Sequence, residues 1–337
     1  MSDAKINCLI RMNYSRISVP LSWVATNIDQ PFTNFGDGLS AIVVSVMSGF
    51  PARHADFDDN IERMVAIGTI GHEQKNGLVH FWGTGVDATR NAVDQTNGFF
   101  ASPDTQYQVH ATRGPLSAKT LRDAGIDAPA IYGDPGWLMP RIWPLHEVEK
   151  THDLGIILHI SELSEETLYA EPADDIIRYK IPAKLRSRIK IINTFSEADP
   201  ESVKNKVAEI VACRRIISTS LHGLVIAETY GIPCSWFSPI SDEGGGKFDI
   251  SDITAEIDHR IADFYAGLGR STVNAYRNKI TSPSDWNAIM DFIDRTWVAV
   301  SNYDESSLIN AFPLPLSVQP GARRWAVAPG LLESIKL

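Results

Sequence analysis

RRIISTSLHGLVIAETYGIPCSWF, the stretch from Arg214 to Phe237, has the clearest secondary-structure pattern in the chain. Apolar residues predict a short strand at 215–218, and a polar turn at 220–223 separates it from a helix predicted over 224–230. Gly231 is typical of a helix C-terminus, and Pro233 stops the helix before a strand predicted over 234–237. Strand, helix and strand in this order form a right-handed βαβ unit, which implies a parallel sheet.

The polar turn of this unit places His222 and Gly223 at the opening of the helix. In an open parallel sheet this is the carboxyl end of a strand, where ligands bind. The free N–H groups and the dipole of a helix N-terminus favour an anion, and a glycine lets a ligand approach the backbone. His222 could therefore give or take a proton beside a bound anion. The alternative is that His222 caps the helix or fills a packing position.

The alternation of strands and helices extends along the whole chain. Strands are predicted at 64–67, 79–82, 108–111, 130–132, 154–160, 189–192 and 216–217. Helices are predicted at 37–47, with Asp37 as its acidic cap, at 115–124, at 199–213 and from Ser282 through Trp297. The segment around 140–151, rich in proline, tryptophan and charge, interrupts the alternation.

We therefore expect an α/β protein of two Rossmann-like, doubly wound halves that face a cleft. The expected domains are 1–147 and 148–281. Residues 282–337 form a final helix and a proline-broken tail that we expect to pack back on the first domain.

Composition excludes several classes of protein. The chain has 337 residues, of which 44% are hydrophobic and 21% charged, and these values are ordinary for a globular protein. Cys8, Cys213 and Cys234 are far apart and form no CxxC pair, so we expect neither a disulfide framework nor a zinc site. The formal net charge of −10 disfavours a nucleic-acid partner.

Targeting signals are missing from the sequence pattern. The N-terminal residues are charged and show no signal-peptide core, and no stretch approaches the roughly 18 apolar residues of a spanning helix. We therefore expect a cytoplasmic protein with free cysteines.

Arg113 occupies, in the first half, a place equivalent to that of His222. It follows the strand at 108–111 and precedes the helix that begins at Pro115. A guanidinium at a strand end is suited to a bidentate grip on a carboxylate or phosphate. A surface ion pair is the alternative.

Further loops follow the same pattern. NFGD at 34–37, GTG at 83–85 and GDP at 133–135 put small or polar groups at strand ends, although turn geometry alone accounts for such residues. GGGK at 244–247 could be a lid that brings Lys247 onto a phosphate, or a plain flexible loop. The chain has no complete GxGxxG fingerprint after a strand and no P-loop.

Together these loops resemble the polysaccharide pyruvyl transferase family. The resemblance is carried, in order, by NFGD at 34–37, WGTG at 82–85, TRGPLS at 112–117, GDP at 133–135, and STSLHG at 218–223 with AETYGIP at 227–233. DFY at 263–265 is a weaker echo. The sequence looks closest to bacterial exopolysaccharide ketal-pyruvate transferases.

The resemblance implies an architecture similar to that of two-domain GT-B glycosyltransferases. It implies transfer of the enolpyruvyl group of phosphoenolpyruvate (PEP) onto two hydroxyls of one sugar, with a cyclic pyruvate ketal and phosphate as products. PEP is then the donor substrate, and no cofactor or metal is expected. The acceptor is an oligosaccharide or a lipid-linked saccharide, which implies a peripheral position at the inner membrane.

The resemblance also assigns residues. It places the catalytic roles on His222 and Arg113, with the first domain on the acceptor side and the second on the PEP side. Some relatives carry a basic residue where this chain has Ser220, so a second cation must come from Lys247, Arg214 or Arg260. The substrate-binding residues expected on this basis are Asn34, Asp37, Gly85, Asp134, Ser220, Leu221, Gly223, Lys247 and Arg260.

Two other functions stay open. A glycosyltransferase that uses a nucleotide sugar could hold a diphosphate at the same helix opening. A family member without activity could bind anionic glycans or act as a scaffold for a biosynthetic complex.

Overall fold

The computed structural model describes residues 11–13, 16–27, 30–90 and 98–337. Cys8 and the N-terminal residues tested for a signal peptide lie outside this description. The strands are β1 (Arg11–Asn13), β2 (Arg16–Ser22), β3 (Phe32–Asn34), β4 (Ala52–His54), β5 (Arg63–Val65), β6 (Gly77–Thr84), β7 (Thr105–Thr112), β8 (Leu154–Ile157), β9 (Ile189–Ile192), β10 (Phe195–Glu197), β11 (Ile216–Ser218), β12 (Cys234–Ser238), β13 (Gly244–Asp249) and β14 (Thr272–Arg277).

The α-helices are α1 (Phe35–Ser48), α2 (Pro115–Asp123), α3 (Met139–Ile142), α4 (Pro200–Val211), α5 (Leu221–Thr229), α6 (His259–Gly267), α7 (Trp286–Thr296) and α8 (Glu305–Asn310). The 3-10 helices are η1 (Gly71–Glu73), η2 (Pro135–Leu138), η3 (Ile160–Glu162), η4 (Ile177–Tyr179), η5 (Ala183–Leu185), η6 (Ile253–Ala255) and η7 (Leu332–Ser334).

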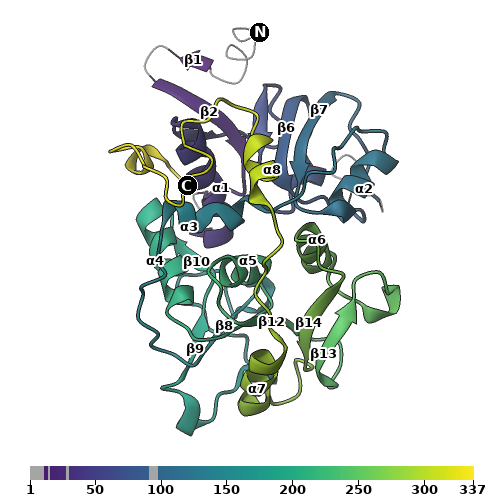
Figure 1. Ribbon diagram of the computed structural model, residues 1–337, viewed down its shortest axis with the longest axis vertical. Helices are drawn as coiled ribbons and strands as arrows, with labels where there is room; N and C mark the ends of the chain where they lie inside the picture. The colour runs from purple at the N-terminus through teal and green to yellow at the C-terminus, as the bar shows by residue number, and fades with distance from the viewer. Residues whose placement is uncertain (1–10, 14–15, 28–29, 91–97) are drawn as a thin grey trace.

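Two mostly parallel sheets organise the molecule, one in each half of Figure 1. The first has the order β1-β2-β5-β6-β7, with β4 also paired to β2, and β1 is its antiparallel strand. The second has the order β13-β14-β12-β11-β8-β9, with β13 antiparallel. The predicted α/β class with parallel sheets is therefore confirmed.

Helices fill the space between the two sheets. In the middle of the molecule α4 packs on α1 and on α5, and both α1 and α5 pack on η2 (Figure 1). One continuous apolar core runs from Leu21 and Met64 of the first sheet through these helices to Ile216 and Ala275 of the second. β3 and β10 form a further antiparallel pair from distant parts of the chain. The two sheets are thus joined by shared packing.

The C-terminal segment contacts both halves. α7 lies against β13 and β14, and the chain then runs up the front of the molecule to α8 (Figure 1). There the indole of Trp82 donates a hydrogen bond of 2.9 Å to the carbonyl of Leu308, and Phe312 packs on the same indole. Further along, the amide of Ser317 donates to the carbonyl of Met47 at 2.7 Å. The final helix, which we expected on the first domain, therefore packs on the second, because its apolar face joins the core of that half. Residues 301–337 cover the first sheet and α1, as expected of the tail.

Local signals explain most helix ends. Gly231 has φ of 67°, a left-handed conformation that closes α5 at the predicted place, and Asp285 caps α7 through the amides of Asn287 and Ala288. The predicted cap of the first helix is wrong. Asn34, not Asp37, caps α1 by accepting a hydrogen bond from the amide of Gly36, so Asp37 lies inside the first turn.

Several predicted elements differ from the structure. The helix predicted over 224–230 begins at Leu221, so the predicted polar turn is largely its first turn, and the helix predicted from Ser282 begins at Trp286. Residues 130–132 make only an isolated bridge, Thr112 to Tyr132, instead of a strand. The strand predicted over 154–160 ends at Ile157, because the chain turns into η3. Residues 244–247 are not a flexible loop but the start of β13, whose glycines lie close against Phe248 and Phe292.

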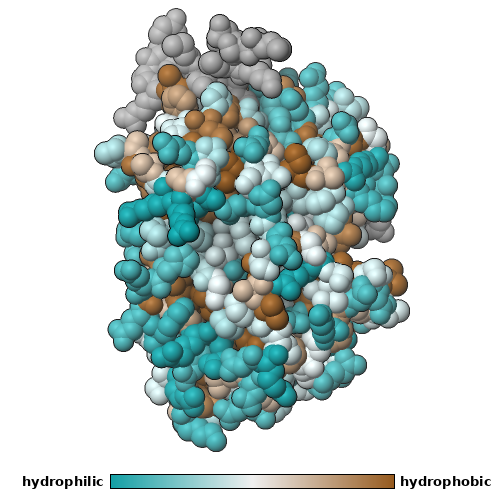
Figure 2. All heavy atoms as spheres, in the orientation of Figure 1, coloured by the Kyte–Doolittle hydropathy of each residue, from teal (hydrophilic) through white to brown (hydrophobic). Residues whose placement is uncertain are grey.

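The described residues include no helix with the length and apolar character needed to cross a bilayer. On the face seen in Figure 2, hydrophobic residues lie in small groups among hydrophilic ones.

Candidate active site between the two sheets

Strand ends from both halves meet in the middle of the molecule. Gly85 follows β6 and Arg113 follows β7 in the first sheet, while His222 lies in the first turn of α5, directly after β11 of the second. Asp134, at the N-cap of η2, comes from the loop after the Thr112 to Tyr132 bridge. The loops singled out by the sequence thus come together in space.

The imidazole of His222 sits in a closely fitted place. Its ring lies edge-on to Phe35, with centroids 6.5 Å apart, and a Cβ atom on Gly36 would overlap it. Only 12% of the side chain is exposed. Burial, and then the positive charges of Arg113 and Arg260, lower the pKa of His222 to about 3, so its imidazole is neutral at physiological pH.

Arg113 is fully buried. Its Nη1 donates a hydrogen bond of 2.6 Å to Thr69, and its Nε lies 3.4 Å from Oδ2 of Asp263. A Cβ atom on Gly85 would overlap the guanidinium, so the glycine at this strand end makes room for Arg113.

Asp134 links the two groups. Its Oδ1 accepts a hydrogen bond of 2.9 Å from the amide of Gly136, and its Oδ2 lies 3.9 Å from Nε2 of His222. Burial raises the pKa of Asp134 to about 6, against the opposing effect of Arg113. Arg113 thus acts on the pKa of both Asp134 and His222, which places all three side chains in one electrostatic environment.

Several buried polar atoms of this group have no hydrogen-bond partner within the described part of the chain. They are Nε2 of His222, Oδ2 of Asp134, and Nε and Nη2 of Arg113. Buried polar atoms are nearly always paired, and an unpaired one costs about 1–3 kcal/mol. Unpaired donors and an acceptor gathered in one place are typical of a site whose ligand supplies the missing partners.

A carboxylate from the second half holds Arg113 and its loop in place. Oδ1 of Asp263, on α6, accepts hydrogen bonds from the amides of Leu116 (2.9 Å) and Ser117 (3.1 Å), and Oδ2 accepts from the Ser117 hydroxyl (2.6 Å). A Cβ atom on Gly114 would overlap the Asp263 carbonyl, so α6 sits directly on this loop. Asp263 therefore connects the halves beside the candidate site.

The three candidates for a second cation lie in different places. Arg260 lowers the pKa of His222, and its guanidinium is held by Asp258 and by His159, whose Nε2 lies 3.1 Å from Nη1. Arg214 is largely exposed beside Asp153. Lys247, in β13, lines a separate small cavity with Glu228 and Arg270. Of the three, Arg260 is the one with an electrostatic effect on His222.

The other predicted binding residues surround His222. Asn34 and Asp37 flank the Phe35–Gly36 pair that contacts the imidazole, and Ser220 and Leu221 precede His222 at the start of α5. A Cβ atom on Gly223 would crowd Ser218 and Ile157. The tight packing of α5 on the sheet thus explains this glycine, in addition to any role toward a ligand.

Comparison with known proteins decides the family. The sequence profile of the polysaccharide pyruvyl transferase family matches residues 13–241, about two thirds of the chain. The chain belongs to this family. It is also similar to an uncharacterized protein of Acanthamoeba polyphaga mimivirus, with 23% identity over 201 residues. That match covers 57% of this chain and 61% of the relative, so the chain spans about three fifths of the relative's length.

In this member of the polysaccharide pyruvyl transferase family, the matched region contains Arg113, Asp134 and His222 but ends before Arg260 and Asp263. Sequence reasoning did not assign Asp263 or Thr69 to the site. The DFY echo at 263–265 was the available signal for Asp263. Among the described residues, no group of three or more His, Cys, Asp or Glu side chains could hold a metal ion.

Replacing Asp263 tests how strongly it joins the halves. Asp263→Ala leaves the buried Arg113 without its counter-ion and α2 without its cap, so we expect a loss of about 3–5 kcal/mol in the free energy of unfolding. Asp263→Asn keeps an oxygen for the two amides and should lose less. Asp123→Ala, which removes an exposed ion pair with Lys119 on the same helix, should change stability by under about 1 kcal/mol. Denaturant titration measures all three, and equal values for Asp263→Ala and Asp123→Ala would contradict this role.

The ionisation of Asp37 should make the stability of the folded protein depend on pH. Burial raises its pKa to about 7, so the folded state retains a proton that the unfolded state releases above about pH 4. This cost is absent below pH 4, grows as the pH rises, and is complete above pH 7. Asp37→Asn should therefore raise the melting temperature more at pH 8 than at pH 5. The gain in the free energy of unfolding should be larger at pH 8 by about 1–3 kcal/mol. Asp175→Asn, at an exposed position, is the control, and a gain that shrinks with rising pH would refute the prediction.

Proposed function

We propose that this protein transfers the enolpyruvyl group of PEP onto two hydroxyls of one sugar residue in a saccharide acceptor, forming a cyclic pyruvate ketal and releasing phosphate. One observation carries the proposal: buried, unpartnered polar atoms of His222, Arg113 and Asp134 gather at strand ends from both sheets. Family membership supports the transferase class.

The chemistry of the site favours an anion with two acidic groups. Nη2 of Arg113 has no partner, and α5, nine residues long, presents its N-terminal amides beside His222. PEP carries a carboxylate and a phosphate, so it can accept from a guanidinium and from helix amides at the same time. Because these buried groups have no hydrogen-bond partner among the described residues, a bound anion would supply bonds that the protein itself does not provide.

The reaction balances as follows. A proton adds to C3 of PEP and leaves an oxocarbenium-like centre at C2. The first sugar hydroxyl attacks C2 and loses its proton. The C2–O bond to phosphate then breaks, phosphate leaves with one proton, and the second hydroxyl attacks C2 and loses its proton to close the ketal. Two protons are consumed and two are released.

His222 and Asp134 are suited to these proton transfers. The imidazole of His222 is unprotonated and so free to accept a proton from an attacking hydroxyl, but a pKa of about 3 makes it a weak base, and this role requires the bound anion to raise that pKa. Asp134, with a pKa of about 6, still carries a proton in part of the molecules near neutral pH. A bound anion raises the pKa of His222, which then can also act as the acid.

The wider arrangement belongs to the same proposal. The two sheets would act as the two halves of a GT-B-like enzyme, with domains 1–147 and 148–281, α7 on the second domain and residues 301–337 on the first. The acceptor would be an oligosaccharide or a lipid-linked saccharide, reached from the cytoplasm at the membrane surface. Arg260, which stays paired with Asp258, would act on His222 through its charge, in place of the basic residue that some relatives carry at the position of Ser220.

PEP binding has a direct measurement. A ligand that binds the native state stabilises it by RT ln(1 + [L]/Kd), which is about 2.7 kcal/mol at 100 times Kd. We expect 1 mM PEP to raise the melting temperature, and 1 mM of a nucleoside diphosphate to leave it unchanged. The reverse result would favour a glycosyltransferase that uses a nucleotide sugar.

The role of His222 is tested by turnover. A positioned acid or base contributes roughly 10²–10⁴ in rate, so His222→Ala should lower phosphate release from PEP in the presence of acceptor by that factor. His146→Ala replaces an exposed histidine and should keep full turnover. The far-ultraviolet spectrum and the melting temperature establish that both variants fold. Near-normal turnover of His222→Ala would refute the assignment.

A further inference from the structure

A cavity of about 270 Å³ opens beside the candidate site, in the second half of the molecule. It lies at the carboxyl ends of three neighbouring parallel strands, β8, β11 and β12. Its walls include His159, Glu162, Thr219, Ile240, Asp258 and Arg260.

The sheet topology marks this place for a ligand. The chain leaves β8 toward β9 on one side and later returns to β11 on the other side of β8. Ligands of open α/β sheets bind where the strand order reverses in this way, outside the carboxyl ends of the strands. At this point the amide of His159, after β8, donates a hydrogen bond of 2.7 Å to the hydroxyl of Thr219, after β11.

The charges in the cavity differ from those around Arg113. The Arg178 guanidinium is paired with Glu162 and stacked over Phe237, with its Cζ 4.5 Å from the ring centroid. Arg260 is paired with Asp258 at 2.7 Å. Both guanidinium groups donate hydrogen bonds to their carboxylates, whereas Nη2 of Arg113 has no partner among the described residues. The lining carries three carboxylates, Glu162, Glu256 and Asp258, against these two arginines, so it offers an anion no net positive charge.

The same walls fit a neutral molecule with many hydroxyls. Carboxylates, guanidinium groups and hydroxyls can exchange hydrogen bonds with sugar hydroxyls, which are both donors and acceptors. Pro239 and Ile240 supply an apolar surface for the C–H face of a ring. The cavity volume is near the lower end of the range of about 300–1,000 Å³ for small-molecule sites, which suits one or two sugar rings.

We propose that this cavity binds a neutral sugar ring of the saccharide acceptor. The acceptor ring then lies in the second half of the molecule, whereas the family resemblance led us to expect the acceptor on the first domain and PEP on the second. The acceptor role rests on the proposed function, whereas sugar binding itself does not. Thr219 lines the cavity and lies three residues before His222, and Arg260 lies in its wall and affects the charge state of His222. A ring held here would therefore stand next to the helix opening at which the pyruvyl group is transferred.

Filling the cavity is the test. Ile240→Trp places a large side chain in the wall, and Ser161→Trp does so from the exposed rim, where folding should tolerate it. Val24→Trp is the control, at a position 48% exposed in the first half. The probes are the methyl glycosides of glucose, galactose, mannose and N-acetylglucosamine, followed by saturation-transfer difference NMR. The shift of melting temperature with PEP is measured on the same samples.

We expect at least one glycoside to give signals with the wild type and with Val24→Trp, and these signals to be lost in both cavity variants. The PEP shift should be unchanged in all four proteins. In turnover, the cavity variants should raise the KM for saccharide at least tenfold and change the KM for PEP less than twofold.

Other outcomes separate the two proposals. Equal glycoside signals in wild type and cavity variants, or none with the wild type, would overturn the cavity assignment. The assignment would also be overturned if the cavity variants lost the PEP-induced shift of melting temperature but kept the glycoside signals. The cavity would then be the anion site. A third outcome is that the wild type binds glycoside, the cavity variants do not, and the wild type transfers no pyruvyl group. That result would support sugar binding in the cavity and refute the proposed function.

Discussion

The buried carboxylate of Asp263 is the interaction on which the arrangement of the candidate site depends. It occupies the place of a helix cap for α2, whose N-cap residue, Gly114, has no side chain to do this. At the same time it compensates the charge of Arg113. A cap provided by the other half of the molecule ties the position of the guanidinium to the docking of α6. The distance between Arg113 and His222 is thus set by packing between the halves and not by either sheet alone.

The side chains of the candidate site are held in place by packing, yet some of their polar atoms have no hydrogen-bond partner. Glycines at 36 and 85 leave room for the imidazole and the guanidinium, and Phe35 and Thr69 fix their orientation. Within this site, Nε2 of His222, Oδ2 of Asp134 and Nη2 of Arg113 have no hydrogen-bond partner among the described residues. Each such atom costs stability, and proteins retain such costs mainly at functional sites.

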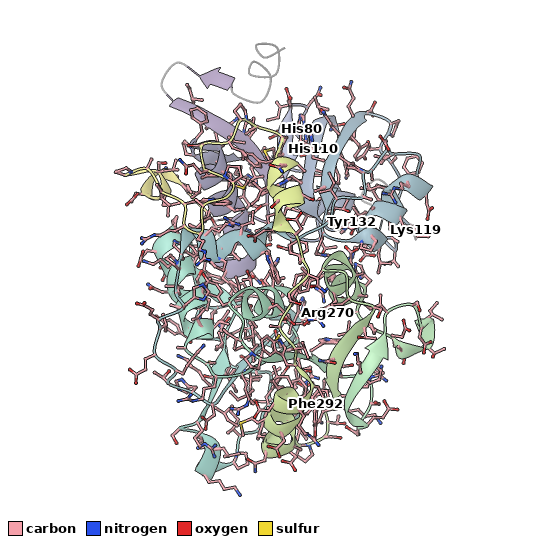
Figure 3. The ribbon with its side chains drawn as sticks, viewed as in Figure 1. His80, His110, Lys119, Tyr132, Arg270 and Phe292 are labelled. Carbon is pink, nitrogen blue, oxygen red and sulfur yellow. The ribbon has the colours of Figure 1, made fainter. Side chains whose placement is uncertain are left out.

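Two further polar clusters have partners within the protein and lie away from this site. His80 and His110, on β6 and β7, stack in the upper half of Figure 3 and are joined at 3.0 Å between ring nitrogens. Arg270 donates to the carbonyls of Val298 and Ala299 and so fastens the chain that follows α7 (Figure 3). Their partners account for these residues structurally, unlike the unpaired atoms of His222, Asp134 and Arg113.

Local patterns in the sequence were enough to predict much of the fold and part of the site. The βαβ unit around His222 was predictable because Gly231 and Pro233 act on neighbouring residues, and the parallel sheets followed from the alternation. Long-range pairing was not predictable. Residues 244–247 form a strand because β14 lies beside them, and Asp263 acts on a helix almost 150 residues earlier in the chain. Lys247 was expected near a phosphate on the assumption of a mobile loop, and its strand holds it elsewhere.

The return of the chain end to the first sheet has a consequence for biosynthesis. Trp82 of β6 obtains its hydrogen-bond partner from Leu308 and its aromatic neighbour from Phe312, more than 200 residues later. During translation, that face of the sheet stays uncovered until residues 308–312 have left the ribosome. Unshielded apolar surface of this kind makes a nascent chain prone to aggregate, so chaperone binding is favoured over a long interval of synthesis.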